Sequence, residues 1–273
     1  MTGPRRSVAS AIRDALFTGE AKAKVFAARQ VARDWRLGQL DFVFEVTMPD
    51  RPEWPDCLEL LAPGAMPRRG KMGSERNRAA LWHALAHIEL NAIDLALDIA
   101  ARFAAMSIPP SFFDNWMQVA SDEARHFTLL RNRLKALGAD YGDLPAHDGL
   151  WQAATDTSGD LISRLAIVPL VLEARGLDVT PGLAAKLREF GDEDTAAILD
   201  VIYHDEKTHV AVGAKWFRFF CARAGVNAAD RFRSLVQEHF HGHVRPPFND
   251  AARAAAGLTP LFYRSLSSAS MSR

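Results

Sequence analysis

A pattern of acidic and histidine side chains occurs twice along this 273-residue chain. Each copy has one glutamate in an apolar, helix-like segment, followed 33 or 34 residues later by Glu-x-x-His. The first copy is Glu89 with Glu123 and His126, and the second is Glu173 with Glu206 and His209. A spacing of three residues places Glu and His side by side on one helix face. The pattern therefore limits the chain to folds that bring several helices together around these side chains.

The acidic residues of this pattern fall on apolar helix faces, where solvated carboxylates are not expected. Glu89, for example, lies four residues after Leu85 and three before Ala92. An unpaired carboxylate in a dry interior costs roughly several kcal/mol, so four of them need compensating cations. Two divalent ions would balance four carboxylates, and carboxylate with imidazole but no thiolate suits iron or manganese. The alternative is a coincidental set of buried polar residues.

Helical periodicity and turn signals divide the chain into helices of unequal length. Expected helices span residues 7–36 (with a break near Thr18-Gly19), 75–105, 111–137, 158–176, 181–190, 192–223 and 227–242. Residues 138–157 predict a loop, and the end of the chain predicts a tail rich in turns. We expect residues 1–73 to form N-terminal helices and a proline-rich arm that packs on the core, and residues 74–273 to form a helical bundle with a C-terminal helix and tail.

The first copy of the pattern has a simple expected geometry. Pro109-Pro110 marks a turn between two long helices, and Glu89 and Glu123 lie about equally far from it. Antiparallel packing would place both glutamates at the same height. The second copy is less regular, because Pro169 predicts a kink and Thr180-Pro181 predicts the start of a separate short helix. That short helix would have to bring the chain back to the height of Glu173.

Composition excludes several classes of protein. Lys+Arg and Asp+Glu number 33 each, so no net charge attracts nucleic acid or an acidic membrane. Two cysteines make neither a disulfide framework nor a zinc knuckle. No apolar run approaches the roughly 18 residues of a membrane span, and Arg13, Asp14 and Glu20 interrupt any signal-peptide core. We expect a cytoplasmic protein without a membrane partner.

Other polar residues near the pattern have two interpretations each. Asp122 and Asp205, directly before the motif glutamates, would accept the second N–H of a metal-bound imidazole, or else are solvated acids. Tyr203 is a candidate catalytic residue, as a hydrogen-bond donor or oxidisable side chain near the metals, or a core tyrosine. His83 and His87 are offset from the Glu89 face and favour supporting or structural roles. The basic cluster of Arg68, Arg69 and Lys71 in the arm is either a solvated loop or a phosphate-binding site. In the tail, Arg245, Asn249 and Arg253 either cap the pocket or make surface contacts.

The six-residue pattern resembles the ligand set of the ferritin-like superfamily of di-iron carboxylate proteins. DEARH at 122–126 resembles the DE-x-R-H box of bacterial multicomponent monooxygenases, whereas DEKTH at 205–209 lacks its arginine. A closer resemblance, over about residues 48–264, is to the bacterial family called domain of unknown function 455, and a more distant one is to the tRNA-modifying hydroxylase that acts on isopentenyl adenosine. The segments that carry the closer resemblance are GSERNRAALWHALAHIELNAIDLALDIAARF, SDEARHFTLL, LEARGLDVTPGLAAKL and RPPFNDAARAAAGL.

This resemblance implies an all-α fold: a ferritin-like four-helix bundle with an N-terminal helical arm and an extra C-terminal helix and tail. It also implies two iron ions (manganese or a mixed Fe/Mn pair being alternatives) held by the six residues. The expected function is a di-iron oxidase or monooxygenase that uses O₂ and an external electron donor to oxidise a small molecule, as a monomer or homodimer. The alternatives are a non-catalytic ferritin-like protein that handles iron or oxidants and, disfavoured by the zero net charge, a tRNA-modifying hydroxylase.

Overall fold

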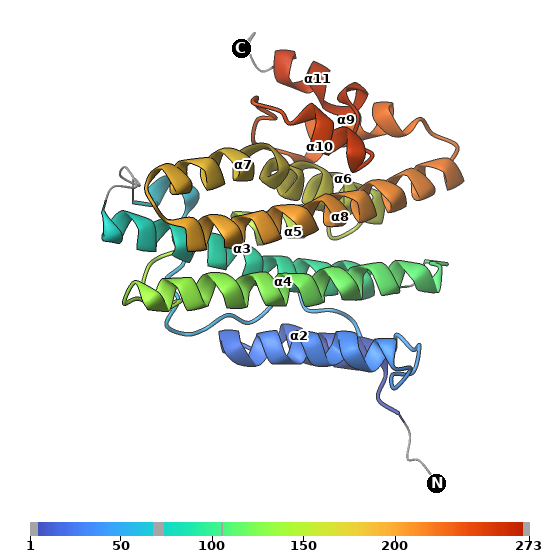
Figure 1. The fold of residues 1–273 in the computed structure, drawn as a ribbon. Helices are drawn as coiled ribbons and strands as arrows, with labels where there is room; N and C mark the ends of the chain where they lie inside the picture. The colour runs from blue at the N-terminus through green and yellow to red at the C-terminus, as the bar shows by residue number, and fades with distance from the viewer. Residues whose placement is uncertain (1–4, 68–73, 105, 270–273) are drawn as a thin grey trace. The chain divides into compact units, whose positions relative to one another are not determined.

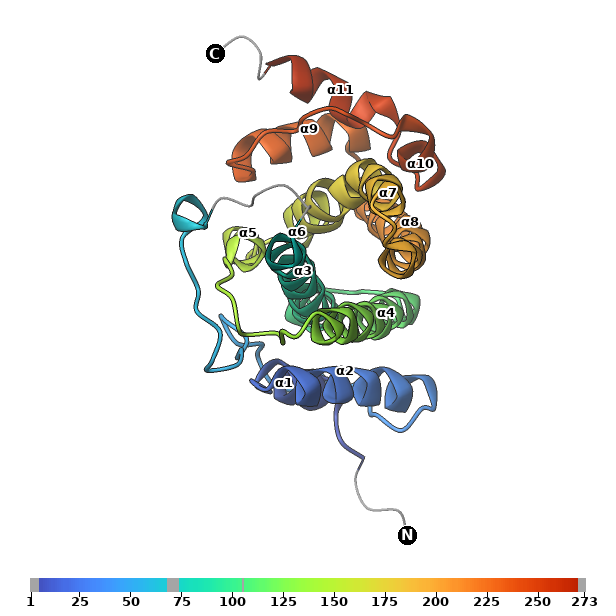
Figure 2. The same ribbon diagram turned by 60° about the vertical axis from the view of Figure 1, so that its left-hand side comes forward.

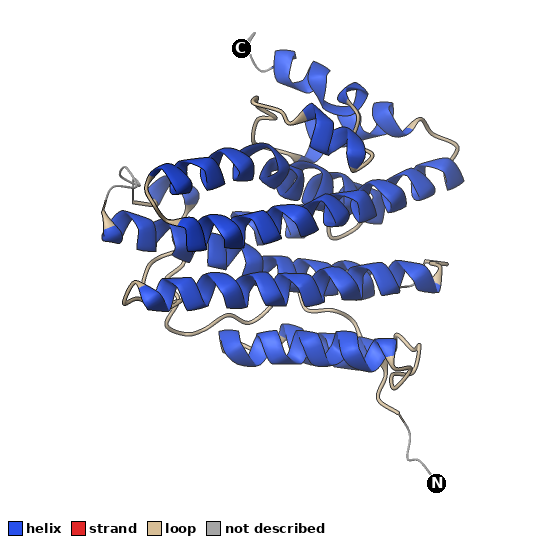
Figure 3. Ribbon diagram, in the orientation of Figure 1, coloured by secondary structure: helices blue, strands red, loops and turns tan. Residues whose placement is uncertain are grey.

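The computed structural model describes residues 5–67, 74–104 and 106–269. Within these ranges the chain is all-α, as predicted, and contains helices and loops but no strand (Figure 3). Contacts divide the chain into two compact units, Met1–Gln152 and Ala153–Arg273. No helix in the described ranges is long and apolar enough to cross a membrane. The predicted basic cluster of Arg68, Arg69 and Lys71 lies outside the described residues, and the predicted division near residue 73 stays a prediction.

The first unit, unit 1, is built on two long helices, α3 and α4 (Figure 1). Ser74 caps α3 by accepting a hydrogen bond from the Asn77 N–H, and the missing N–H of Pro110 costs nothing at the first position of α4. Gly138 ends α4 with a φ of 78°, which glycine adopts without strain. The predicted hairpin is confirmed. The helices of this unit are α1 (Val8–Leu16), α2 (Ala21–Arg36), the 3₁₀ turn η1 (Pro63–Ala65), α3 (Glu75–Arg102), α4 (Pro110–Ala136) and the start of α5 (Gly149–Asp156).

The N-terminal helices pack on the hairpin within unit 1. In Figures 1 and 2, α2 runs alongside α4. Helix α1 contacts α2 and α3. Glu20 caps α2 by accepting from two backbone N–H groups, so the predicted break between the two helices is confirmed. The arm follows α2 and binds α3, since Trp54 donates a hydrogen bond to Asp94 and Arg102 donates to the Pro49 carbonyl.

In the second unit, unit 2, a predicted helix boundary is absent. No separate helix starts at Thr180-Pro181, because α7 runs unbroken through Pro181. Proline removes the hydrogen bond to the carbonyl four residues earlier, here that of Leu177. The side chain of Asn249 donates to this carbonyl at 3.3 Å, which offsets the loss. The helices of this unit are α6 (Leu161–Ile167), the π-helix η2 (Val168–Glu173), α7 (Ala174–Glu189), α8 (Glu193–Arg223), α9 (Ala228–His239), α10 (Asp250–Ala255) and α11 (Pro260–Ala269).

Pro169 lies in the π-helix η2, whereas its sequence context predicts a kink in an α-helix. Single turns of π-helix insert one residue into a helix and occur often at functional sites. The turn packs against Gly213 of α8, where an added Cβ would lie 2.5 Å from the Pro169 Cβ. Gly213 is therefore required for the close approach of η2 to α8, and η2 ends at Glu173.

Two segments predicted to be irregular are helical. The loop predicted at 138–157 contains α5, whose last-turn carbonyl of Ala154 accepts a hydrogen bond from buried Arg164. The tail forms α10 and α11. Arg253 is buried, which contradicts the surface contact that is one of its two interpretations: its guanidinium makes two hydrogen bonds to Asp178, of 2.8 and 2.6 Å. These interactions join residues far apart in sequence, so local patterns did not predict them.

Candidate metal centre

Helix α3 carries polar side chains on two opposite faces. Glu89 lies on one of them. Asp98 is nine residues, or two and a half turns, further along, which places it on the other side of the helix. His83, His87 and Asp94 share the face of Asp98. All five side chains are buried, with at most 6% of their surface exposed. The two faces therefore need separate explanations.

On the first face, three of the predicted ligands come together within unit 1. The Nδ1 atom of His126 lies 3.3 Å from an oxygen of Glu89 and 3.1 Å from an oxygen of Glu123. One ligand-type atom from each of the three residues lies within 4.8 Å of the other two. Glu123 and His126 have no exposed surface, and Glu89 retains 6%. The predicted equal height of Glu89 and Glu123 in the hairpin is thus confirmed.

The electrostatics of this cluster are those of a cation-binding site. Burial and the negative charge of Glu123 raise the pKa of Glu89 well above its usual range. Burial opposes the charged form of His126, but hydrogen bonds from Nδ1 to Glu123 and Glu89 and their charges outweigh it and raise the pKa of His126 to about 11. A proton on His126 therefore supplies positive charge where the two carboxylates converge. A metal ion bound by Nδ1 would displace that proton.

The donor set suits particular metals. Two carboxylates and one imidazole, with no cysteine in the cluster, are ligands that iron and manganese accept readily. Such ligands also leave positions on the ion for other groups, because six-coordinate ions need more than three donors. The residues present in unit 1 therefore fit one half of the predicted centre.

Unit 2 contains the other three predicted ligands. Glu206 and His209 lie one turn apart on α8, with Glu206 Oε1 3.7 Å from His209 Nδ1, and both side chains are buried. Glu173 is the last residue of η2 and is half-buried. The η2 turn packs against α8. The structure thus places Glu206 and His209 next to one another on α8, while their role as ligands and a joint role for all six residues stay predictions.

The predicted supporting residues have contacts of their own. Asp122 accepts a hydrogen bond from Gln118 and pairs with Arg125 at 3.6 Å, both on α4. Tyr203 accepts a hydrogen bond of 3.0 Å from the side chain of Asn249. Asp205 is half-buried on α8. The roles proposed for Asp122, Asp205 and Tyr203 toward metal-bound histidines or metals stay predictions.

The second face of α3 was not identified from the sequence. His87 contacts Tyr141 Oη at 2.8 Å through Nδ1 and donates from Nε2 to the His147 carbonyl at 3.0 Å, while His83 Nε2 accepts from the Gly142 N–H. A carbonyl can only accept, so the proton of His87 is on Nε2 and Tyr141 donates to Nδ1. These contacts attach the 138–148 loop to α3, in line with the structural role expected for the histidines. The 3- and 4-residue spacing of the buried polar positions was the signal that would have shown this face.

Comparison with family models assigns most of this chain to one family. The family described as "Protein of unknown function (DUF455)" matches residues 17–264. A protein of Haemophilus influenzae, described as "Uncharacterized protein", is 39% identical over 224 residues, which cover 80% of this chain and 77% of that protein. No solved structure matches. The match over most of the chain shows that this protein belongs to the DUF455 family.

Proposed function

We propose that the protein is a di-iron oxidase or monooxygenase that uses O₂ to oxidise a small molecule. In this proposal the hairpin of unit 1 and the η2, α7 and α8 helices of unit 2 are parts of a ferritin-like four-helix bundle. Two iron ions, or manganese in their place, would be held by Glu89, Glu123 and His126 from unit 1 and by Glu173, Glu206 and His209 from unit 2.

The observation that supports this proposal most directly is the convergence of two buried glutamates on one histidine nitrogen. Nδ1 of His126 lies within 3.3 Å of both carboxylates, and all three side chains are almost fully buried. The same residue types, at the same spacing, recur on α8. Bound iron would supply redox chemistry toward O₂, and the protein would hold the ions, exclude bulk water and orient the substrate.

Metal analysis of purified protein tests the site. We expect about two iron or manganese ions per chain. Glu123→Gln in unit 1 and Glu206→Gln in unit 2 should each lower the metal content of the whole protein, because a shared centre needs both halves. Glu75→Gln, at an exposed position in the first turn of α3, is the matched control and should keep both ions. A protein that keeps its full metal content in Glu206→Gln would contradict a shared centre.

Oxygen consumption tests the reaction class. An iron-loaded oxidase given a chemical reductant should consume O₂ well beyond the amount of iron it holds. Uptake that stops once the bound iron is oxidised would contradict the oxidase proposal and would instead indicate a protein that handles iron. Glu123→Gln, which is expected to lose the ions, should take up no O₂ whether the protein is an oxidase or handles iron, so this variant is the negative control.

A further inference from the structure

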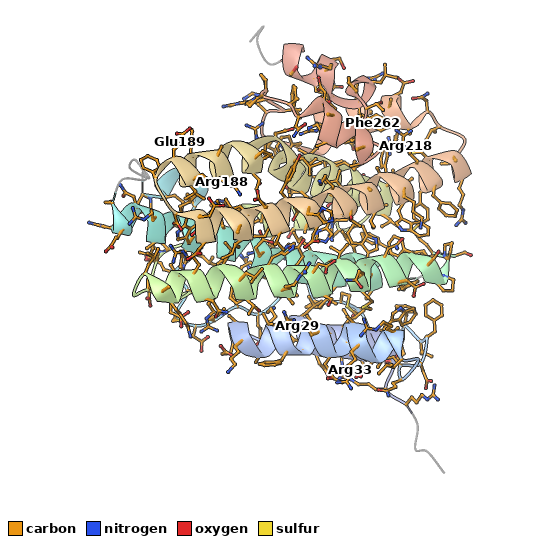
Figure 4. The ribbon with its side chains drawn as sticks, in the orientation of Figure 1. Arg29, Arg33, Arg188, Glu189, Arg218 and Phe262 are labelled. Atoms are coloured by element: carbon orange, nitrogen blue, oxygen red, sulfur yellow. The ribbon has the colours of Figure 1, made fainter. Side chains whose placement is uncertain are left out.

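Helices α2 and α4 of unit 1 form a groove lined by basic side chains, the α2–α4 groove. One hollow of about 400 Å³ is lined by residues of both helices, and a second of about 260 Å³ shares Arg29 with it. Five of the α2 residues that line the two hollows, Lys22, Phe26, Arg29, Arg33 and Arg36, are spaced alternately by four and three residues. This spacing places them in one row along a helix. Figure 4 labels Arg29 and Arg33 on α2.

The charge of this row is not balanced. Arg29, Arg33 and Arg36 make no ion pair with any residue in the described part of the chain. Asp114 in the groove already accepts a hydrogen bond of 2.8 Å from Trp35 Nε1. Arginine groups without a carboxylate partner are free to bind an acidic one, and they do so with two parallel hydrogen bonds.

Apolar side chains continue the groove at its end. Trp35, which lines the larger hollow, contacts Phe42 with ring centroids 5.7 Å apart. Phe42, Val43 and Leu37 are each about half exposed, at 48, 47 and 53%. Arginine and aromatic residues dominate the binding energy of protein interfaces, and exposed apolar patches with polar rims mark such interfaces.

The groove lies behind the candidate metal centre. Asp114, Gln118 and Ser121 face the groove from α4. Glu123 is nine residues, or two and a half turns, from Asp114 and so lies on the opposite side of the same helix. One helix, about 10 Å thick, therefore separates the groove from the proposed ligands Glu123 and His126.

We propose that the α2–α4 groove docks an acidic electron-carrier protein, the partner that the proposed function requires. The identity of the partner as an electron carrier rests on the proposed function, whereas its acidic charge is inferred from the groove alone. The row from Lys22 to Arg36 is about 21 Å long, which exceeds what one small anion would cover, and the exposed aromatic side chains extend it further. The carrier would release one electron per encounter, and one metal ion would accept it.

Binding of a plant-type [2Fe–2S] ferredoxin, an acidic one-electron carrier, tests the proposal directly. Arg29→Glu/Arg33→Glu should weaken binding by about tenfold or more at low ionic strength, because reversed charges repel the carrier. Lys186→Glu/Arg245→Glu, at exposed positions of unit 2, changes the net charge equally and should bind like the unmodified protein. Binding should also weaken as salt is added.

Two further readouts separate the possible failures. Metal content and thermal melting should be the same in both double variants and the unmodified protein, because Arg33, Lys186 and Arg245 are exposed and the half-buried Arg29 makes no ion pair in the described part of the chain. The rate at which metal-loaded protein oxidises the reduced carrier should fall only in Arg29→Glu/Arg33→Glu, while reduction by dithionite stays unchanged. A protein without metal would overturn the proposed function but leave the binding result readable. Absence of ferredoxin binding, or equal losses in both double variants, would overturn the docking site.

Discussion

Replacement of Lys24 with methionine should destabilise the protein by about 3–5 kcal/mol at pH 7, because it leaves a buried carboxylate without its cation. Lys24 Nζ lies 2.6 Å from Asp94 Oδ1, and neither side chain has any exposed surface. Lys24 also donates to the Leu16 carbonyl at 3.3 Å, and Trp54 donates to the other oxygen of Asp94 at 3.2 Å. The pair therefore joins α2, α3 and the arm at one point inside unit 1.

The pKa of Asp94 sets the scale of this effect. Burial raises the pKa of Asp94 from 3.8 to about 6, although Lys24 and Trp54 both lower it. One pKa unit corresponds to 1.36 kcal/mol, so ionised Asp94 already costs the folded state about 3 kcal/mol with the lysine present. Without Lys24 the pKa rises further. Because the folded state then binds the proton more tightly than the unfolded state, the stability of Lys24→Met should fall as pH rises from about 4 through the folded pKa.

Urea unfolding of a double-mutant cycle measures this coupling. Lys24→Met/Asp94→Asn removes both charges and keeps an acceptor for Trp54, so it should cost only about 1–2 kcal/mol. The single and double variants should then be non-additive by about 2 kcal/mol or more. Additive costs, or a stability of Lys24→Met that does not fall relative to that of Lys24→Met/Asp94→Asn between pH 5 and pH 8, would refute the argument that Asp94 depends on Lys24 for its charge.

Three other substitutions test contacts that define the two units. Arg253→Met should cost about 3 kcal/mol, because Asp178 stays buried without its main partner, and limited proteolysis should then cut the tail faster. Gly213→Ala should cost about 1–3 kcal/mol, since its Cβ would overlap Pro169; an unchanged melting temperature would contradict this close packing. Burial lowers the pKa of His87 to about 4, so unmodified protein should lose stability as pH falls from 6.5 toward 4, and His87→Gln should lose less over that range.

The hairpin of unit 1 was predictable from sequence because its signals are local. Each helix end depends on a residue at that end: Ser74 caps the start of α3 with a hydrogen bond, Pro110 begins α4, and Gly138 ends α4 with a positive φ angle. The proximity of Glu89 and Glu123 was predictable because they lie about equally far from the turn between α3 and α4. His126 was predictable because it lies three residues after Glu123 on α4. The cluster of Glu89, Glu123 and His126 in unit 1 could therefore be predicted from local sequence patterns.

The irregular part of unit 2 was not predictable in the same way. Pro181 normally ends a helix, and the compensating donor, Asn249, is 68 residues away. The π-turn at Pro169 likewise depends on Gly213 of another helix. Lys24 gives no local sign of burial either, because its partner, Asp94 of α3, lies 70 residues further along the chain. In each case a distant side chain reverses what the local pattern indicates.

The two polar faces of α3 show two ways to keep buried acids in one helix. On the second face, Asp94 is paired with Lys24 and Asp98 with Arg102, so each negative charge has a cation of its own. On the first face, the hydrogen bonds within unit 1 bring two carboxylates, Glu89 and Glu123, to a single imidazole. An arginine or lysine would have balanced this face in the way the second face is balanced. The use of histidine, which gives up its proton to a metal and stays as a ligand, is the difference that favours a metal centre over a structural ion pair.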